Sequence, residues 1–314
     1  MSLYTFKPVY QERIWGGRNL ETLYKRAIPA GKIGESWELV DRPEANSELL
    51  EADGKNTTLH DLWINKRKQV FGTDAPDTPR FPVLLKLLDA QDKLSVQVHP
   101  PAAKAAELKG EPKTELWYFL HTEKDANIYV GLKKGVTRAD FEKAIGTPKL
   151  ADLLHTLPTS PSQVMFLPSG RLHAIGAGNV IFEIQQNSDT TYRVDDWSRV
   201  DDKGKARDLH IPESLASINF NDPEPTFGQP HGERVIECPY FSIYRTFLFP
   251  GEYRTWNPNG KSFQYHFLAQ GEVTLDKHTF TAGQGWLVSA DTPQYDITPG
   301  KEGAELVTVQ LGIA

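Results

Sequence analysis

The most constraining feature of this sequence is a succession of short segments that are rich in β-branched and aromatic residues and separated by Gly, Pro, Asp or Asn. Such a pattern is typical of a sandwich or barrel of antiparallel strands. Before residue 220, strands are predicted at 36–40, 82–88, 94–99, 115–120, 127–132, 163–167 and 180–185. Helical periodicity is confined to 58–71, 100–109, 137–157 and 212–218. We therefore predict a mainly β chain in which helices are inserted into an antiparallel barrel.

A segment rich in Pro, Gly and Asp, "FNDPEPTFGQPHG", interrupts this pattern at 220–232, and short strand-like runs resume after it. We predict three parts, which are an N-terminal metal-binding domain with helical insertions (1–220), a linker (221–232) and a smaller second barrel (233–314).

A weak internal repeat supports two related barrels, because residues 160–184 are echoed at 279–309. Where the first copy has His173, the second has Gln294 or Tyr295. We interpret this as two barrels of which only the first kept its metal ligands. The alternative is that two sets of ordinary strands look alike by chance.

Charge and cysteine content narrow the function classes. The formal net charge is −6 and the pI is near 5.9, which argues against nucleic acid as the main partner, because phosphate backbones attract basic surfaces. The single cysteine excludes an intrachain disulfide and favours a reducing compartment. No apolar run of about 18 residues is present. We expect a cytoplasmic protein without a membrane or nucleic-acid partner, and the sequence leaves monomer or dimer open.

A polar strand face raises the question of function. In a strand, alternate side chains share a face, so Gln97 and His99 point the same way, together with Ser95. Glu115 lies in another predicted strand, and His173 follows the turn "PSG". Two imidazoles, a carboxylate and an amide oxygen suit a borderline divalent ion, and a zinc site with open positions fits best. The alternative for each residue taken alone is an ordinary hydrogen-bonded side chain.

Five stretches of the first 220 residues resemble the short bacterial type I phosphomannose isomerases, which belong to the cupin superfamily. They are "IWGG" (14–17), "IGESWEL" (33–39), "FPVLLKLLDAQDKLSVQVHP" (81–100), "KTELWY" (113–118) and "FEIQQNSDTTYRVDDW" (182–197). The resemblance implies two cupin-type jelly-roll barrels and one Zn²⁺ per chain, held by Gln97, His99, Glu115 and His173. It also implies a small-molecule sugar phosphate as substrate, with mannose 6-phosphate and fructose 6-phosphate interconverted through a cis-enediol.

The same resemblance suggests roles for individual residues. Arg193 matches the family's catalytic arginine, and we expect it on a loop that reaches over the metal. Glu183 matches a candidate acid/base carboxylate, with a purely structural partnership to Arg193 as the alternative. Lys113 shares the face of Glu115. Desolvation beside Zn²⁺ would lower its pKa for proton transfer, with simple neutralisation of the phosphate as the alternative. Lys86 and Ser95 are candidate substrate-binding residues.

Two rival functions remain at the level of the sequence. One is a metal-dependent cupin of another class, such as an iron dioxygenase, which typically uses two His and one carboxylate. The other is a non-catalytic sugar-phosphate sensor. The extra Gln97, the cations Lys86 and Lys113, and the joint presence of Glu183 and Arg193 favour the isomerase.

Overall fold

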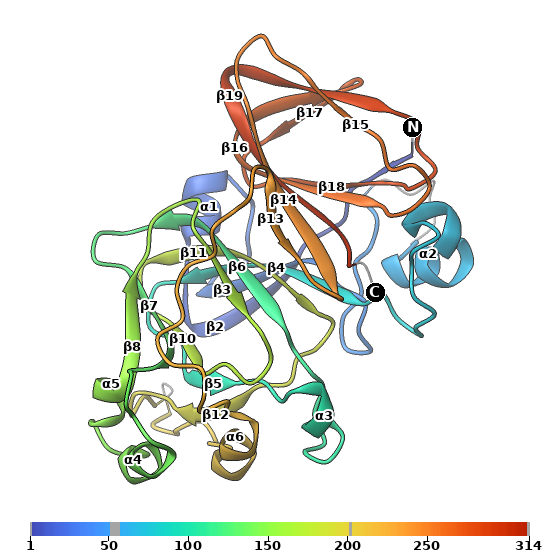
Figure 1. The fold of residues 1–314 in the computed structure, drawn as a ribbon. Coiled ribbons are helices and arrows are strands. Elements are labelled where there is room, and N and C mark those ends of the chain that lie inside the picture. The colour runs from blue at the N-terminus through green and yellow to red at the C-terminus, as the bar shows by residue number, and fades with distance from the viewer. Residues whose placement is uncertain (1, 51–56, 201–202, 313–314) are drawn as a thin grey trace.

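The computed structural model describes residues 2–50, 57–200 and 203–312, and its antiparallel sheets form two barrels (Figure 1). The mainly β fold with helical insertions in the N-terminal part is therefore confirmed. Each of the seven strands predicted before residue 220 is present, although the one predicted at 94–99 is only three residues long. None of the helices in the described ranges has the length and apolar character needed to cross a membrane.

Two sheets form the first barrel. The six-stranded sheet has the order β2 (Val9–Gly17), β3 (Ile33–Leu39), β4 (Val83–Ala90), β11 (Asn179–Gln186), β6 (Glu115–Thr122) and β9 (Val164–Leu167). The five-stranded sheet has the order β12 (Tyr192–Asp195), β5 (Val96–Val98), β10 (His173–Ile175), β7 (Asn127–Leu132) and β8 (Leu154–Pro158).

The adjacent strands β3, β4 and β11 of the six-stranded sheet are buried on both faces, which explains the nearly continuous apolar runs in their sequences. In β4, Leu85 and Leu87 belong to the largest apolar cluster, which also holds residues of the second barrel. Lys86 alternates with them and therefore faces the interior of the first barrel. A charged residue in such a strand lacks water on either side, so it marks a position where the barrel interior is polar.

The second barrel is one sheet in the order β1 (Leu3–Tyr4), β18 (Gly285–Val288), β16 (Gln264–Leu275), β19 (Tyr295–Leu311), β14 (Phe241–Leu248) and β13 (Arg234–Glu237). Two further strands, β15 (Arg254–Trp256) and β17 (His278–Thr281), pair with β19 and β16. The barrels share one core, in which the rings of Phe182 and Phe267 stack with centroids 4.4 Å apart. The division at 220 and 233 stays a prediction, and the structure adds that β1 pairs with β18 across it.

The helices are short and lie at the edges of the barrels (Figure 1). They are α1 (Asn19–Tyr24), α2 (Leu59–Lys66) continued by a π-helix (Arg67–Phe71), α3 (Ala102–Ala105), α4 (Arg138–Ala144), α5 (Leu150–Leu153) and α6 (Ile211–Ser217). The helical periodicity predicted at 137–157 is confirmed only in part, as the two short helices α4 and α5. Gly146, at φ 74°, and Pro148 follow the end of α4, and residues 154–158 form strand β8, which pairs with β7. The sequence also gave no prediction of α1.

Candidate active site and metal centre

One row of side chains crosses the five-stranded sheet. Gln97 in β5 lies directly opposite His173 in β10 on one side and opposite Arg193 in β12 on the other. Directly opposed residues of antiparallel strands project from the same face. These three side chains therefore share the inner face of the barrel. The expectation that Arg193 lies on a loop is wrong, because strand pairing with β5 holds it.

A second row crosses the six-stranded sheet. Lys86 lies opposite Glu183, and Trp37 and Trp117 are the next residues on either side. Lys86 Nζ is 3.8 Å from Glu183 Oε1 and 3.7 Å from Glu35 Oε2. Trp117 Nε1 donates to Glu183 Oε2 at 2.9 Å. Glu183 is thus partnered by Lys86 and Trp117, and not by Arg193 as the structural alternative required.

Three of the four predicted metal ligands form a compact cluster. His99 Nε2 is 3.5 Å from Glu115 Oε2, and His173 Nε2 is 3.4 Å from Glu115 Oε1. One ligand atom from each of the three residues lies within 4.8 Å of the others, and all three side chains are buried. The fold of the first barrel thus brings together residues that are up to 74 positions apart in the sequence.

The hydrogen bonds of the two imidazoles fix which nitrogen is free. His99 Nδ1 donates to the carbonyl of Thr190 and His173 Nδ1 to that of Arg171, each at 2.8 Å. A carbonyl only accepts, so each Nδ1 carries the proton and each Nε2 presents a lone pair to the cluster. His99 Nε2 and both carboxylate oxygens of Glu115 are buried without a hydrogen-bond partner. Such atoms are rare in folded proteins, and a cation between them would satisfy all of them.

Burial keeps the imidazoles neutral. It lowers the pKa of both histidines, that of His173 to about 3. Burial alone would raise the pKa of Glu115, but the charged ammonium group of Lys113 holds it below its usual range. The cluster therefore offers two neutral imidazoles and one carboxylate at neutral pH, which is the protonation state that metal binding requires.

Gln97, the fourth predicted ligand, lies beside the cluster. Its Nε2 is 3.4 Å from His173 Nε2, while its Oε1 accepts from Ser95 Oγ at 3.5 Å. Amide oxygen and nitrogen are assigned from such contacts, and a half-turn of the group exchanges them. After that rotation the oxygen would face the cluster.

Lys113 and Glu183 lie next to the cluster and carry shifted pKa values. Lys113 Nζ is 3.5 Å from Glu115 Oε2. Burial would lower the pKa of Lys113, but the carboxylate of Glu115 and its neighbours raise it, which favours the charged ammonium. A lowered pKa beside bound Zn²⁺ stays a prediction. Burial, followed by repulsion from Glu115, raises the pKa of Glu183 to about 7. A carboxyl group with this pKa can both take up and release a proton near neutral pH.

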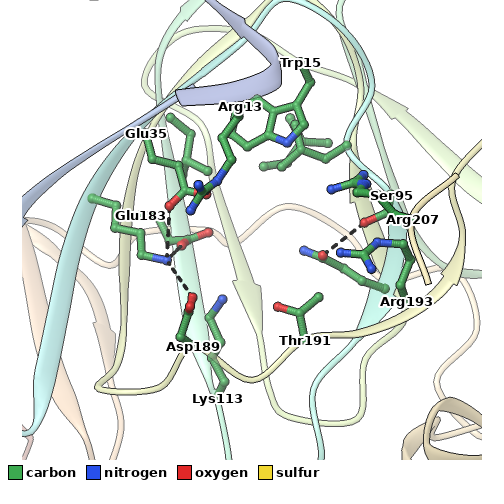
Figure 2. Close-up of a pocket in the computed structure, with 15 residues that line it drawn as sticks. Arg13, Trp15, Glu35, Ser95, Lys113, Glu183, Asp189, Thr191, Arg193 and Arg207 are labelled. Atoms are coloured by element: carbon green, nitrogen blue, oxygen red, sulfur yellow. Dashed lines mark hydrogen bonds and ion pairs between the residues drawn. The ribbon is translucent and has the colours of Figure 1, made fainter. Parts of the chain in front are cut away.

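A cavity of about 410 Å³ opens onto these residues (Figure 2). Its lining is mostly polar and consists of Arg13, Trp15, Glu35, Lys86, Leu88, Leu94, Ser95, Gln97, Lys113, Ile175, Glu183, Asp189, Thr191, Arg193 and Arg207. Figure 2 shows Glu35, Glu183 and Asp189 on one side and Ser95, Arg193 and Arg207 on the other. All of the predicted catalytic and substrate-binding residues therefore line one cavity, and the metal cluster adjoins it through Gln97 and Lys113.

Four charged residues of the lining were not predicted, namely Arg13, Glu35, Asp189 and Arg207. Glu35 carried a usable signal, because it is a charged residue in a strand that is buried throughout, as Lys86 is. Arg13 donates to Glu35 Oε1 at 2.9 Å, a contact that only the pairing of β2 with β3 creates. No pattern in the sequence separated Arg207 from other loop arginines.

Comparisons with known proteins agree with this geometry. Residues 3–125 match the catalytic domain of type I phosphomannose isomerases. The mannose-6-phosphate isomerase ManA of Bacillus subtilis is 39% identical over 248 residues, which cover 76% of this chain and 77% of that protein. The crystal structure of a mannose 6-phosphate isomerase from Bacillus subtilis has a TM-score of 0.86 at 27% identity and covers 98% of this chain and 99% of that one.

A more distant likeness concerns the fold alone. A mannose 6-phosphate isomerase solved with bound zinc and yttrium has a TM-score of 0.77 at 19% identity, with both chains covered completely. The motifs, the cavity and the relatives lead to the same conclusion, which confirms the resemblance read from the sequence. The chain belongs to the type I phosphomannose isomerase family of enzymes.

Proposed function

We propose that the chain interconverts mannose 6-phosphate and fructose 6-phosphate and that it does so with one zinc ion. Family membership and the activity named for the Bacillus subtilis relative support the reaction. The observation that carries the metal is the set of buried atoms without partners on His99 and Glu115. Two imidazoles and a carboxylate suit zinc, and a protein of the same fold binds zinc.

The proposed ligands are His99, Glu115 and His173, with Gln97 as the fourth through its amide oxygen. Zinc held there would act as a Lewis acid toward the oxygen atoms at the reacting end of the substrate. The hydrogen bonds from the two Nδ1 atoms to backbone carbonyls hold both rings in the required orientation.

Glu183 is the proposed proton carrier. The reaction transfers a proton between C2 and C1 of the open-chain sugar, so a group near the metal must accept it and return it. Glu183 lines the cavity, its raised pKa suits both steps, and the hydrogen bond from Trp117 orients its carboxyl group. Lys113 remains charged and is placed to stabilise negative charge that develops on the substrate oxygens.

The remaining predicted residues are proposed to bind substrate. Arg193 is a permanent cation whose Nε is buried without a hydrogen-bond partner, which leaves it available to a negatively charged ligand. Lys86 lies within 4.0 Å of three carboxylates, so it holds Glu183 and Asp189 in the cavity wall as well as facing the ligand. Ser95 offers a hydroxyl group from the opposite wall.

A coupled assay of the purified chain tests this proposal. We expect mannose 6-phosphate to be converted to fructose 6-phosphate, the activity to disappear after treatment with a chelator, and stoichiometric zinc to restore it. Full activity in protein shown to be free of metal would refute the metal proposal. No isomerisation by zinc-loaded, folded protein would refute the reaction itself.

A further inference from the structure

Lys86 lies in the middle of a row of side chains that crosses four strands of the first barrel. Trp37 of β3 is opposite Lys86 on one side, and Glu183 of β11 is opposite it on the other. Trp117 of β6 follows Glu183 in the row and donates its indole N–H to that carboxylate at 2.9 Å. Trp37 donates its indole N–H in the same way, to Glu35 Oε2 at 2.6 Å. Two carboxylates, each held by a tryptophan, therefore flank the ammonium group of Lys86.

Charge and an aromatic face hold this ammonium group, because its distances to the carboxylates exceed those of hydrogen bonds. Lys86 Nζ is 3.7 Å from Glu35 Oε2 and 3.8 Å from Glu183 Oε1. A third carboxylate, that of the half-exposed Asp189, is 4.0 Å away, where solvent weakens the attraction. Nζ also lies over the indole ring of Trp37, 5.0 Å from its centroid. The N–H donors of Lys86 therefore remain available to a ligand in the cavity.

The two flanking carboxylates differ in their other contacts. Glu35 Oε1 accepts from Arg13 Nε at 2.9 Å, so a second cation pairs with the oxygen that faces away from Lys86 and Trp37. Figure 2 shows Arg13 beside Glu35 in the cavity wall. Burial alone would raise the pKa of Glu35, but the charges of Lys86 and Arg13 hold it at about 2. Glu35 is therefore ionised at neutral and at mildly acidic pH.

Glu183 alone would not hold Lys86 throughout a catalytic cycle. In the proposed reaction it takes up a proton and returns it, so its negative charge is absent during part of each cycle. The Coulomb attraction between Glu183 and Lys86 disappears with that charge. Glu35 exchanges no proton in this scheme and keeps its charge in every step.

We propose that Glu35 is a positioning residue, which holds the Lys86 ammonium group toward the ligand in both protonation states of Glu183. Arg13 and Trp37 in turn fix the two oxygens of Glu35. Glu35 thus acts through Lys86 and need not touch the substrate. Without its charge, Lys86 would be drawn toward Glu183 and away from the ligand. This inference rests on the proposed function, since it assigns a role within the same site.

A double-mutant cycle on the zinc-loaded protein tests this role. Calorimetry measures binding of mannitol 6-phosphate, a reduced analogue that cannot isomerise. Lys86→Met should weaken binding on the order of 10- to 100-fold, because a charged hydrogen bond to the ligand is lost, and Glu35→Gln should weaken it about 10-fold. In the Lys86→Met background, Glu35→Gln should cause no further loss. With mannose 6-phosphate, the loss in Glu35→Gln should divide between kcat and KM as it does in Lys86→Met.

Glu38→Gln is the matched control. Glu38 lies on the same strand, is as buried as Glu35 and pairs with Arg26 at 2.7 Å, but it does not line the cavity. Its affinity, kcat and KM should stay at the wild-type values. Trp37→Phe is a second test variant, which keeps a ring beneath Lys86 and removes the N–H that donates to Glu35. It should weaken binding less than Glu35→Gln does, and only while Lys86 is present.

The outcomes separate this inference from the proposed function. Thermal unfolding identifies the folded variants, and Trp37→Phe carries the cycle if Glu35→Gln does not fold. Wild-type affinity in the folded test variant would overturn the positioning role. So would an undiminished loss in the Lys86→Met background, or an equal loss in Glu38→Gln. If the wild type binds the analogue and shows the expected coupling but does not isomerise mannose 6-phosphate, the role of Glu35 stands and the proposed reaction falls.

Discussion

Both barrels bury histidines among polar side chains, but the ring nitrogens of these histidines are hydrogen-bonded in opposite ways. In the second barrel, Tyr295 donates to Gln264 Oε1 at 2.6 Å, so its hydroxyl oxygen accepts from His266 Nε2 at 2.7 Å. The other ring nitrogen, His266 Nδ1, accepts from Thr308 Oγ1 at 2.9 Å. Both nitrogens of His266 are therefore used within the protein, and its Nε2 carries the proton.

In the first barrel the arrangement is reversed. His99 and His173 carry their protons on Nδ1 and donate them outward to backbone carbonyls, so that the Nε2 atoms point at Glu115. A barrel interior tolerates polar groups only when they are paired. In the second barrel, Tyr295 and Thr308 complete the hydrogen bonds of His266. In the first barrel, lone pairs of His99, His173 and Glu115 face one another, an arrangement that could hold a cation.

His173→Ala should have the largest effect, because it removes one of the proposed metal ligands, whereas Tyr295 of the second barrel completes a hydrogen bond to His266. We expect bound zinc and isomerase activity to fall to background while the chain stays folded. Metal analysis, the coupled assay and thermal unfolding on one preparation measure this. Tyr295→Phe is the matched control and should keep both zinc and activity. Full zinc occupancy in His173→Ala would contradict the ligand assignment.

Glu183→Gln should have the next largest effect. When the echoing stretches are aligned on their last residues, Ile184 and Val309, Glu183 of the first barrel corresponds to Thr308 of the second. Thr308 only completes a hydrogen bond, whereas we propose that Glu183 transfers a proton. The variant should keep its zinc and lose kcat by about 10²- to 10⁴-fold. Near wild-type kcat would remove Glu183 from the chemistry.

The pH profile sharpens the same prediction. Glu183 acts as a base when deprotonated, and its pKa is raised from 4.5 to about 7, so kcat/KM should fall as the pH drops through that interval. A cation at Glu115 would offset part of the repulsion and move the midpoint toward the lower end. The acid limb should be absent in the residual activity of Glu183→Gln. Its persistence there would assign the limb to another group.

The sequence predicted the strands, and three of the four proposed ligands, His99, Glu115 and His173, lie together in the structure. Both results depend on local patterns. Alternation placed Gln97 and His99 on one face, and the turn before His173 marked the start of a strand. The echo between the two halves left Gln294 and Tyr295 open for the position of His173. In the structure Gln294 is exposed, whereas Tyr295 is buried against His266 and so is the one of the two that lies in the barrel interior, as His173 does. Which of Gln294 and Tyr295 faces the interior depends on the side-chain alternation of β19. The sequence of the preceding turn does not show where that alternation begins.

Local sequence patterns could not predict side-chain contacts between different segments of the chain. Arg207 acquires its place from Asp196, and Arg13 from Glu35, and in neither case does the spacing reveal the pairing. The carboxylates that raise the pKa of Lys113 were likewise not apparent from the sequence, although its burial was. Similarity to known proteins identifies the family, whereas the positions of these side chains are seen only in the three-dimensional structure.

His266→Ala should have the smallest effect on activity and the clearest effect on stability. The substitution leaves the Tyr295 hydroxyl and Thr308 Oγ1 without their partner in a buried site, which should lower the free energy of unfolding by about 1–3 kcal/mol. Zinc content and kcat of the folded variant should match the wild type. Loss of zinc in this variant would contradict the inference that only the first barrel takes part in metal binding. Urea unfolding, metal analysis and the coupled assay provide the measurements.

The pH dependence of that stability difference checks its cause. Burial lowers the pKa of His266 from 6.5 to about 3, so between these values the unfolded chain binds a proton at this position and the folded chain does not. The unfolded state is then favoured as the pH falls, and the contribution of His266 to wild-type stability decreases. Because both proteins keep the same first barrel, its titration cancels in the comparison. The stability gap between wild type and His266→Ala should therefore be smaller at pH 5 than at pH 7, and an equal gap at both would show that His266 is not buried in its neutral form.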